Sequence, residues 1–302
     1  MTSLSLSGAD TGRPLRQRLG GFVALTKPRI IELLLVTTLP TMIVADHGLP
    51  SVRLMLATLV GGTLAAGGAN ATNMYVDRDI DAVMHRTARR PLVTGAVTPR
   101  EALVFAIGLE VAAFALLWGV VNLLSAALAL GAMLFYVFVY TLWLKRTSVQ
   151  NIVIGGAAGA VPVLVGWAAV RDSIGLAPIL LFALIFVWTP PHFWALAFRY
   201  RDDYRSVDVP MMPAVAPLDR VARQILAYSL LVVATSLAFG WAAGAGALYW
   251  AAAVVTGAIF LGYAVRLLQE QSEARAMRLF HWSITYVTLL FAAMAIDQFV
   301  HL

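Results

Sequence analysis

The sequence predicts an all-α, polytopic membrane protein with nine transmembrane helices around a central cavity open to the cytoplasmic side. Composition is the first reason, because 60% of the 302 residues are hydrophobic and only 13% are charged. Average soluble domains are about one-quarter charged, and the mean hydropathy of this chain is +0.80. Long apolar runs and an uneven distribution of Lys and Arg are the other two reasons. The chain length is therefore interpreted as a number of membrane spans rather than as a number of soluble domains.

Apolar runs define the predicted spans, because crossing a hydrocarbon core of about 30 Å takes about 20 residues. The run 102–144 would be about 65 Å long as one helix, twice the membrane thickness. We therefore expect it to fold back at Gly119–Asn122. The predicted spans are Ile30–Ala45, Leu54–Val76, Ala102–Val121, Leu123–Leu144, Asn151–Val170, Leu176–Phe198, Ile225–Ala243, Leu248–Val265 and Leu279–Val300.

The cations fix the predicted orientation. Of the 22 Lys and Arg residues, all but Arg53 and Arg171 fall in the N-terminal segment and in alternate loops. The positive-inside rule then places the N-terminus in the cytoplasm and the C-terminus outside. A missed or extra span would scramble this asymmetry, so it supports the count of nine. The net charge of +6 thus indicates a lipid bilayer as partner and no nucleic acid.

Residues 1–26 are interpreted as a short, mobile cytoplasmic tail, because they contain arginines but no apolar core of signal-peptide length. Residues 27–302 are predicted to form one nine-helix domain. An uncleaved tail favours a bacterial cytoplasmic (inner) membrane over a mitochondrial one, with a transit peptide as the minor alternative. The absence of cysteine excludes disulfides and thiolate ligands.

The first acidic cluster follows the second predicted span. Asn73, Asp77 and Asp81 are spaced i, i+4, i+8, which forms one helical stripe drifting by about 40° per step. Such side chains at a membrane edge are costly unless they are paired or bound to metal. Oxygen ligands without a nearby His or Cys favour Mg²⁺. Asp79 lies off the stripe and is interpreted as structural; the alternative for all of them is ordinary ion pairing with neighbouring arginines.

The second acidic cluster follows the sixth predicted span. Asp202 and Asp203 could bind a second Mg²⁺, whereas Asp208 stands just before Pro210 and is the least secure member. A plain solvated loop explains this segment about equally well.

A diphosphate also needs cations around it. Lys145 and Arg146 are the preferred clamps, because they stand alone on a short loop near Tyr140. Arg86, which follows the first cluster, is a further candidate, since arginine binds phosphate through two parallel N–H groups. The alternative for each is a charge that only sets topology.

These segments resemble a known family. The stripe Asn73, Asp77, Asp81 resembles the first aspartate-rich motif of the UbiA superfamily of intramembrane prenyltransferases. The wider text resembles the branch that transfers a farnesyl group to protohaem IX, and the block 188–197 is the most specific part. Val207-Asp208 departs from the branch pattern. The matching segments are 25–29, 73–81, 84–87, 90–92, 140–147, 151–156, 188–197, 203–204 and 210–213.

The resemblance implies a reaction and a ligand set. Farnesyl diphosphate would bind through Mg²⁺ held by Asp77, Asp81 and Asp203. The haem b vinyl group would take the farnesyl group and water would add, giving haem O. Haem A synthase or terminal-oxidase assembly are the implied later partners. The implied catalytic set also contains Asn73 and Lys145, and the implied substrate-binding residues are Arg86, Tyr140, Arg146, Asn151, Trp188, His192, Trp194, Asp202 and Tyr204.

His192 lies within the sixth predicted span, next to Pro190 and Pro191, which are expected to break the helix so that it lines a cavity. Its imidazole is interpreted either as a ligand of haem iron or as a partner of a freed carbonyl, with equal weight. For His281 a structural role is preferred.

Two other functions stay open from the sequence. One is a UbiA-type prenyltransferase with a quinone precursor or another aromatic acceptor, against which the block 188–197 argues. The other is a secondary transporter, for which a proline-broken sixth helix is the supporting feature. Against transport, the acids cluster at one membrane edge rather than at the midplane.

Overall fold

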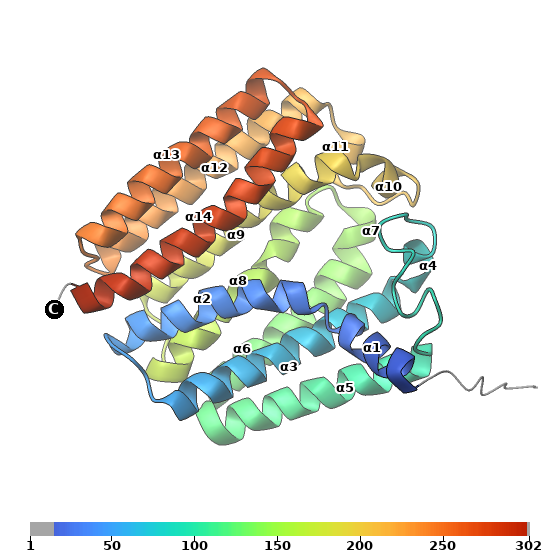
Figure 1. The fold of residues 1–302 in the computed structure, drawn as a ribbon, viewed down its shortest axis with the longest axis horizontal. Coiled ribbons are helices and arrows are strands. Elements are labelled where there is room, and N and C mark those ends of the chain that lie inside the picture. The colour runs from blue at the N-terminus through green and yellow to red at the C-terminus, as the bar shows by residue number, and fades with distance from the viewer. Residues whose placement is uncertain (1–14, 301–302) are drawn as a thin grey trace, which may run out of the picture.

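The computed structural model describes residues 15–300, with the side chains of all but residues 29–35. The described chain forms helices and loops without a strand (Figure 1). The helices are α1 (Leu15–Leu25), α2 (Pro28–Asp46), α3 (Val52–Val76), α4 (Arg78–Asp81), α5 (Pro99–Leu116), η1 (Leu117–Val121), α6 (Leu123–Leu134), η2 (Phe135–Leu144), α7 (Lys145–Thr147), α8 (Asn151–Arg171), α9 (Leu176–Arg199), α10 (Arg201–Arg205), α11 (Met212–Val215), α12 (Leu218–Ala242), α13 (Ala247–Gln269) and α14 (Glu273–Val300).

The all-α membrane architecture predicted from the sequence is confirmed. Within the described residues, 8 helices are long and apolar enough to cross a membrane. Helix α2 has 19 residues, of which only Val36–Asp46 counts as an apolar stretch among the side chains described. The protein is thus a multi-pass membrane protein, and the count of nine spans stays a prediction.

The predicted fold-back in the run 102–144 lies where expected. Helix η1 ends at Val121, and Asn122 has an extended backbone before α6 begins. The Asn122 side chain accepts a hydrogen bond from the Ser125 backbone N–H at 2.8 Å and donates to the Ala168 carbonyl at 2.7 Å. One asparagine therefore caps α6 and joins this turn to the end of α8.

Several helices extend beyond the apolar runs that predicted them. Helix α12 begins at Leu218 rather than at residue 225, and α14 begins at Glu273 rather than at residue 279. The added turns carry charged residues such as Arg220, Arg223 and Arg275. Hydropathy detects the part of a helix that suits hydrocarbon, whereas backbone hydrogen bonding continues into the polar interface.

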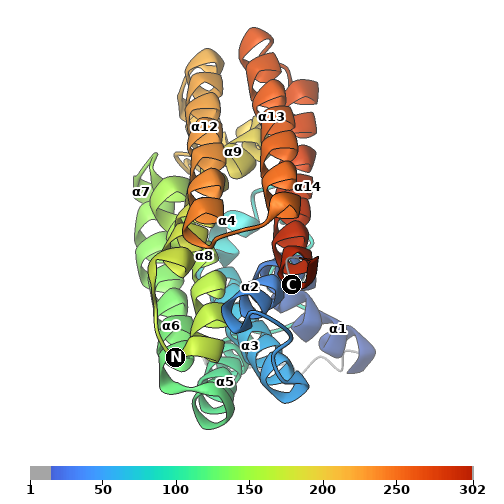
Figure 2. The ribbon, with the colours of Figure 1, turned by 90° about the vertical axis from the view of Figure 1, so that its left-hand side faces the viewer.

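The short helices gather at one end of the bundle. In Figure 1, α4, α7, α10 and α11 lie together at the right-hand side, near α1. We call this the charged end and define it as residues 77–98, 145–150 and 200–217. Figure 2 shows α12 and α13 running side by side with α14 next to them, and these helices share with α8 and α9 the larger hydrophobic core.

Helix α9 is continuous through Pro190 and Pro191. The expectation that these prolines break the sixth span was therefore wrong. Two prolines remove two backbone donors, but α9 stays helical on both sides while α12, α8 and α14 pack against it. Tertiary packing overrides the local effect of the prolines, and the feature that favoured a transporter is absent from this helix.

Part of the predicted tail is folded. Leu15–Leu25 forms α1, in which Gly21 and Leu25 are buried. A Cβ on Gly21 would lie 2.7 Å from a methyl group of Val97, so the helix rests closely on the loop before α5. Residues 1–14 lie outside the described residues, and the mobility of the tail stays a prediction.

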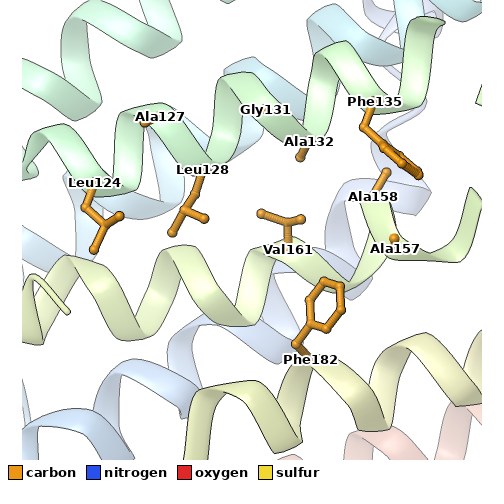
Figure 3. A pocket seen from close by; sticks show the side chains of 10 residues that line it. All are labelled: Leu124, Ala127, Leu128, Gly131, Ala132, Phe135, Ala157, Ala158, Val161 and Phe182. Atoms are coloured by element: carbon orange, nitrogen blue, oxygen red, sulfur yellow. The ribbon is translucent and has the colours of Figure 1, made fainter. Parts of the chain in front are cut away.

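An apolar cavity of 360 Å³ lies between α6, η2, α8 and α9. Figure 3 shows Leu128, Val161 and Phe182 pointing toward one another across it. None of the residues proposed from the sequence for catalysis or substrate binding lines it. The expected central cavity open to the cytoplasmic side stays a prediction.

Candidate active site

The aspartate stripe is built by a helical path that continues past the end of α3. The Asp77 backbone N–H donates to the Asn73 carbonyl at 2.9 Å, and the Asp81 N–H donates to the Asp77 carbonyl at 2.9 Å. The i, i+4, i+8 spacing thus acts as predicted, with Asn73 3%, Asp77 0% and Asp81 1% exposed. Three polar side chains are buried on one face at the charged end.

Asp77 has two different carboxylate oxygens. Its Oδ2 accepts hydrogen bonds from the Lys145 ammonium and from Asn73 Nδ2, the latter at 2.8 Å. Its Oδ1 is buried without a hydrogen-bond partner within the described residues, and Arg146 Nη2 stands 3.8 Å away. A buried carboxylate oxygen without a partner is costly. Asp77 therefore presents one oxygen that a ligand can use.

Asp81 repeats this arrangement one turn further on. Its Oδ2 forms an ion pair with Arg90 Nη1 at 2.5 Å. Its Oδ1 has no hydrogen-bond partner in the part of the chain that is described. The Thr87 hydroxyl donates to the Asp81 carbonyl at 3.0 Å and holds the following loop against the stripe.

Three residues that contact the stripe, Lys27, Arg90 and Thr141, are not among the site residues proposed from the sequence. The Lys27 ammonium, between α1 and α2, donates to Asn73 Oδ1 at 2.9 Å, and Asn73 Nδ2 also lies 3.2 Å from the Thr141 hydroxyl. Burial holds the pKa of the Lys27 amino group well below its usual value, and the nearby Arg90 and Lys145 charges lower it further. The segment 25–29, which matches the family pattern, is the sequence feature that could have identified this lysine as a site residue.

Lys27 also has an unusual backbone. Its φ of 52° and ψ of 65° place it in the left-handed region, directly before Pro28. A side-chain-bearing residue is uncommon there, and such strain persists only where the surrounding structure imposes it. The turn from α1 into α2 thus directs Lys27 to the stripe.

Asp79 lies off the stripe, as predicted, and binds Arg146. Both Asp79 oxygens accept from this guanidinium at 2.7 Å. The hydrogen bonds from Arg146 lower the pKa of the Asp79 carboxyl to about 2. A cavity of 410 Å³ lined by Arg78, Asp79 and Arg146 opens beside this pair, so Asp79 holds one cation at the edge of the stripe.

The three aspartates of the second cluster have different surroundings in the structure. Asp203 Oδ2 accepts a hydrogen bond from the Arg86 backbone N–H at 3.0 Å, which joins the two long loops of the charged end. Asp202 has 81% of its side chain exposed and pairs with Arg201 and Arg205. Asp208 is exposed with a φ of 52°, so it is a turn residue. Only Asp203 of the three faces the loop that follows the first cluster.

Arg86 also contacts two aromatic rings. Its guanidinium lies 5.5 Å from the ring centre of Tyr200 and 5.8 Å from that of Tyr204. Arg86 Nη2 donates to the Tyr204 hydroxyl at 3.4 Å. These contacts hold an exposed arginine over the start of α10.

Tyr140 and Asn151 lie between the two clusters in sequence, on either side of α7. Tyr140 stacks on Tyr136 with ring centres 5.4 Å apart and fills the space that a side chain on Gly155 would take. Asn151 is fully buried and donates weakly to the Pro210 carbonyl at 3.5 Å. Its Oδ1 has no partner among the described residues, so Asn151 too carries a free acceptor.

The three aromatic residues proposed on α9 divide between two neighbours. Trp188 donates from Nε1 to the Ser283 carbonyl at 2.9 Å, and His192 Nδ1 lies 2.7 Å from the Ser283 hydroxyl, so both face α14. Trp194 is fully buried against Tyr228 of α12. The structure thus does not bring Trp194 beside the other two. His281 is exposed, and its structural role stays a prediction.

The acidic residues are of the type that binds Mg²⁺, although they do not form a complete set of protein ligands. Across the described residues, no three His, Cys, Asp or Glu side chains approach closely enough to form a metal cluster. The free Oδ1 atoms of Asp77 and Asp81 are nevertheless suitable hard ligands. Mg²⁺ commonly takes one or two carboxylates and completes its shell with water and substrate phosphate.

Fold and site together define a membrane-embedded prenyltransferase. The family profile described as UbiA prenyltransferase family matches residues 34–286, and the chain belongs to this family. Two relatives named protoheme IX farnesyltransferase are similar over nearly the whole chain. That of Streptomyces avermitilis is 53% identical, covering 98% of this chain and 99% of its own. That of Frankia casuarinae is 55% identical, covering 93% and 98%.

Solved structures share the fold. A digeranylgeranylglyceryl phosphate synthase has a TM-score of 0.77 at 16% identity, over 93% of this chain and 99% of its own. A UbiA homologue from Archaeoglobus fulgidus bound to DMAPP and Mg²⁺ has a TM-score of 0.65 at 15% identity, over 91% and 99%. At these identities the likeness concerns the fold alone.

Proposed function

We propose that this protein transfers the farnesyl group of farnesyl diphosphate to a vinyl group of protohaem IX, with addition of water, giving haem O. The observation that carries the proposal is the pair of buried carboxylates, Asp77 and Asp81, each with one oxygen held by a cation and one oxygen free. The name shared by relatives above 50% identity supports the choice of farnesyl diphosphate and haem as substrates.

The cations around the stripe suit a diphosphate. Lys27, Arg90 and Lys145 donate to the stripe itself, and Arg146 stands at its edge. They come from three separate segments, namely the turn between α1 and α2, the loop after α4, and α7, so the charges surround the carboxylates rather than lying on one side. Arginine offers two parallel donors and lysine a compact charge, which are complementary for phosphate binding.

Asp77, Asp81 and Asp203 would hold Mg²⁺. The metal would neutralise the diphosphate leaving group and so lower the barrier to ionisation. The protein residues keep the carboxylates in place: Asn73 donates to Asp77, and the Arg86 backbone N–H donates to Asp203. A homologue with the same fold is bound to DMAPP and Mg²⁺, which is consistent with metal-assisted binding of a diphosphate in this fold.

The proposed reaction needs no protein nucleophile. The bond between C1 of the farnesyl group and oxygen breaks, and its electron pair leaves with the diphosphate. The haem vinyl π electrons form the new carbon–carbon bond, and water adds to the resulting cation and loses a proton. The buried lysines and arginines stabilise charge that develops on the leaving group.

The surroundings of the stripe favour such a cation. Helices α8 and α9 supply buried apolar residues to the bundle below the charged end. An apolar environment limits the access of water before the carbon–carbon bond forms. The farnesyl chain would extend from the charged end into this region.

We further infer that the charged end faces the cytoplasm of a bacterium. The basic loops support a cytoplasmic N-terminus and an outer C-terminus by the positive-inside rule, and the relatives are bacterial. The product would pass to haem A synthase or to terminal-oxidase assembly in the same inner membrane.

The test is direct. The purified chain in lipid nanodiscs is incubated with haem b, farnesyl diphosphate and Mg²⁺, and the extracted haem is analysed by mass spectrometry. We expect a haem heavier by one farnesyl group and one hydroxyl group, whose formation EDTA abolishes and added Mg²⁺ restores.

Parallel reactions offer a quinone precursor in place of haem. Prenylation of that acceptor with no haem product would overturn the proposed substrate while leaving the UbiA family assignment intact. Ion-driven uptake into vesicles without any prenyl chemistry would support the transporter instead.

A further inference from the structure

The imidazole of His192 is held between two aromatic rings. Trp188, one turn earlier on α9, stacks on one face with ring centres 4.3 Å apart and planes inclined by 19°. Phe280 of α14 covers the other face at 4.6 Å and 28°. Rotation of the imidazole out of this plane would break both stacks, so the ring orientation is fixed.

The hydrogen bonds of Ser283 determine where the imidazole carries its proton. The Ser283 hydroxyl lies 2.6 Å from the Phe280 carbonyl oxygen, a distance at which the hydroxyl must donate its hydrogen. The same oxygen lies 2.7 Å from His192 Nδ1. Since the only hydroxyl hydrogen is already used, Nδ1–H donates to Ser283.

A proton on Nδ1 leaves Nε2 of the neutral ring with a lone pair. Within the described residues, the hydrogen bond of the imidazole is formed by Nδ1 and not by Nε2. His192 keeps 7% exposure, and Ser283 is fully buried beneath it. A tautomer fixed by a second residue is the usual arrangement of a histidine that binds a metal.

The position of His192 suits a porphyrin that reacts at the charged end. It precedes the end of α9 at Arg199 by seven residues, which corresponds to about 10 Å along the helix. Haem iron and the reacting vinyl group lie at different points of one flat ring. Iron held by His192 would therefore lie about 10 Å along α9 from the end of the helix.

We propose that His192 Nε2 binds the iron of the haem acceptor as an axial ligand, and that Ser283 is the positioning residue that fixes its tautomer. The proposal rests on haem being the acceptor, as in the proposed function. Trp188 supports Ser283 from the other side through its hydrogen bond to the Ser283 carbonyl.

The experiment titrates the full chain in lipid nanodiscs with ferric protohaem and records the absorption spectrum and the dissociation constant, with empty nanodiscs subtracted. We expect a histidine-ligated spectrum for the wild type and its loss in His192→Gly, with recovery on adding free imidazole. His281→Ala, next to Phe280 but exposed, is the matched control and should bind as the wild type does.

Ser283→Ala should weaken haem binding roughly 10- to 100-fold, the usual cost of losing a residue that orients a metal ligand. Ser283→Thr, which keeps the hydroxyl, should retain the wild-type spectrum. Thermal unfolding of each variant reports folding, and the imidazole recovery of His192→Gly tests the ligand even if Ser283→Thr folds poorly.

An unchanged spectrum and affinity in His192→Gly would overturn the proposal. Asp77→Asn distinguishes haem ligation by His192 from the proposed farnesyl transfer, because it should abolish the transfer while leaving the haem spectrum intact. A wild type that forms haem O but shows no histidine ligation refutes the ligand and leaves the proposed function standing.

Discussion

Lys145 and Asp77 form an ion pair across 68 residues of sequence, between α7 and the end of α3. The pair occupies Oδ2 of the carboxylate and leaves Oδ1 free. The lysine thus compensates the buried charge without covering the oxygen that a metal would use. A buried charge without such a partner would be strongly unfavourable.

The first prediction concerns the free oxygens. Asp77→Asn and Asp81→Asn keep the shape of each side chain but remove the negative charge that binds Mg²⁺. We expect farnesyl transfer to fall by at least roughly 100-fold, the size of effect typical of losing one group that stabilises transition-state charge. Product formation in nanodiscs measures this. Asp208→Asn, at an exposed turn, is the control, and wild-type rates in Asp77→Asn would refute the site.

The second prediction concerns the ion pair itself. Lys145→Met removes the cation nearest to the buried Asp77 carboxylate and leaves its hydrogen bond from Asn73, so we expect a loss of about 3 kcal/mol of stability, the low end for a broken buried pair. Arg146, at 3.8 Å from Asp77 Oδ1, is the reason for choosing the low end. Thermal unfolding followed by tryptophan fluorescence measures the change.

The double variant Lys145→Met with Asp77→Asn separates stability from catalysis. Removing both charges leaves no uncompensated group, so most of the stability should return while farnesyl transfer stays lost. Additive effects of the two substitutions would contradict the coupling, since residues in contact should show an interaction energy of at least about 0.5 kcal/mol.

Much of the fold could be predicted because hydropathy adds up over whole helices. The runs that became α3, α8 and α13 needed no knowledge of their neighbours. The starts of α12 and α14 were missed because charged turns extend a helix without lowering its backbone hydrogen bonding. The proline prediction was wrong because the packing of α9 decides its geometry, and local rules do not contain that packing.

The candidate site could be predicted only along the chain. The spacing of Asn73, Asp77 and Asp81 follows from helix geometry, and its backbone hydrogen bonds are present. The residues that contact this stripe could not be predicted in the same way. Lys27 looks like an ordinary topology-setting charge in sequence, and the role of Ser283 beside His192 depends on how α14 packs on α9.

The third prediction concerns the contact of α8 with α2. A Cβ on Gly166 would lie 2.8 Å from the Thr38 backbone carbonyl, and backbone cannot move aside cheaply. Gly166→Ala should therefore destabilise the protein by about 1–3 kcal/mol, as overpacking does. Gly159→Ala on the same helix is the matched control, because nothing lies within 4 Å of its added Cβ. Equal melting temperatures for the two variants would contradict the close approach.

The last prediction concerns pH and the pair of Asp79 with Arg146. The folded pKa of Asp79 is about 2, below its ordinary value of 3.8. The unfolded chain thus binds more protons in this range, and the stabilisation is present above about pH 4 and is lost as the pH falls toward 2. Because 59% of the Asp79 side chain is exposed, the contribution should be only about 0.5 kcal/mol.

Asp79→Asn should lower the stability at pH 7 by about 0.5 kcal/mol and should remove the part of the stability that is lost between about pH 4 and pH 2. The measurement compares thermal unfolding of wild type and variant between pH 2 and pH 5 at low salt, where surface pairs are least screened. Asp208→Asn serves as the control, since Asp208 is a residue of an exposed turn. Farnesyl transfer at limiting farnesyl diphosphate should fall modestly in Asp79→Asn, because Arg146 loses the carboxylate that orients it. An unchanged pH profile would show that the pair of Asp79 and Arg146 does not contribute to stability.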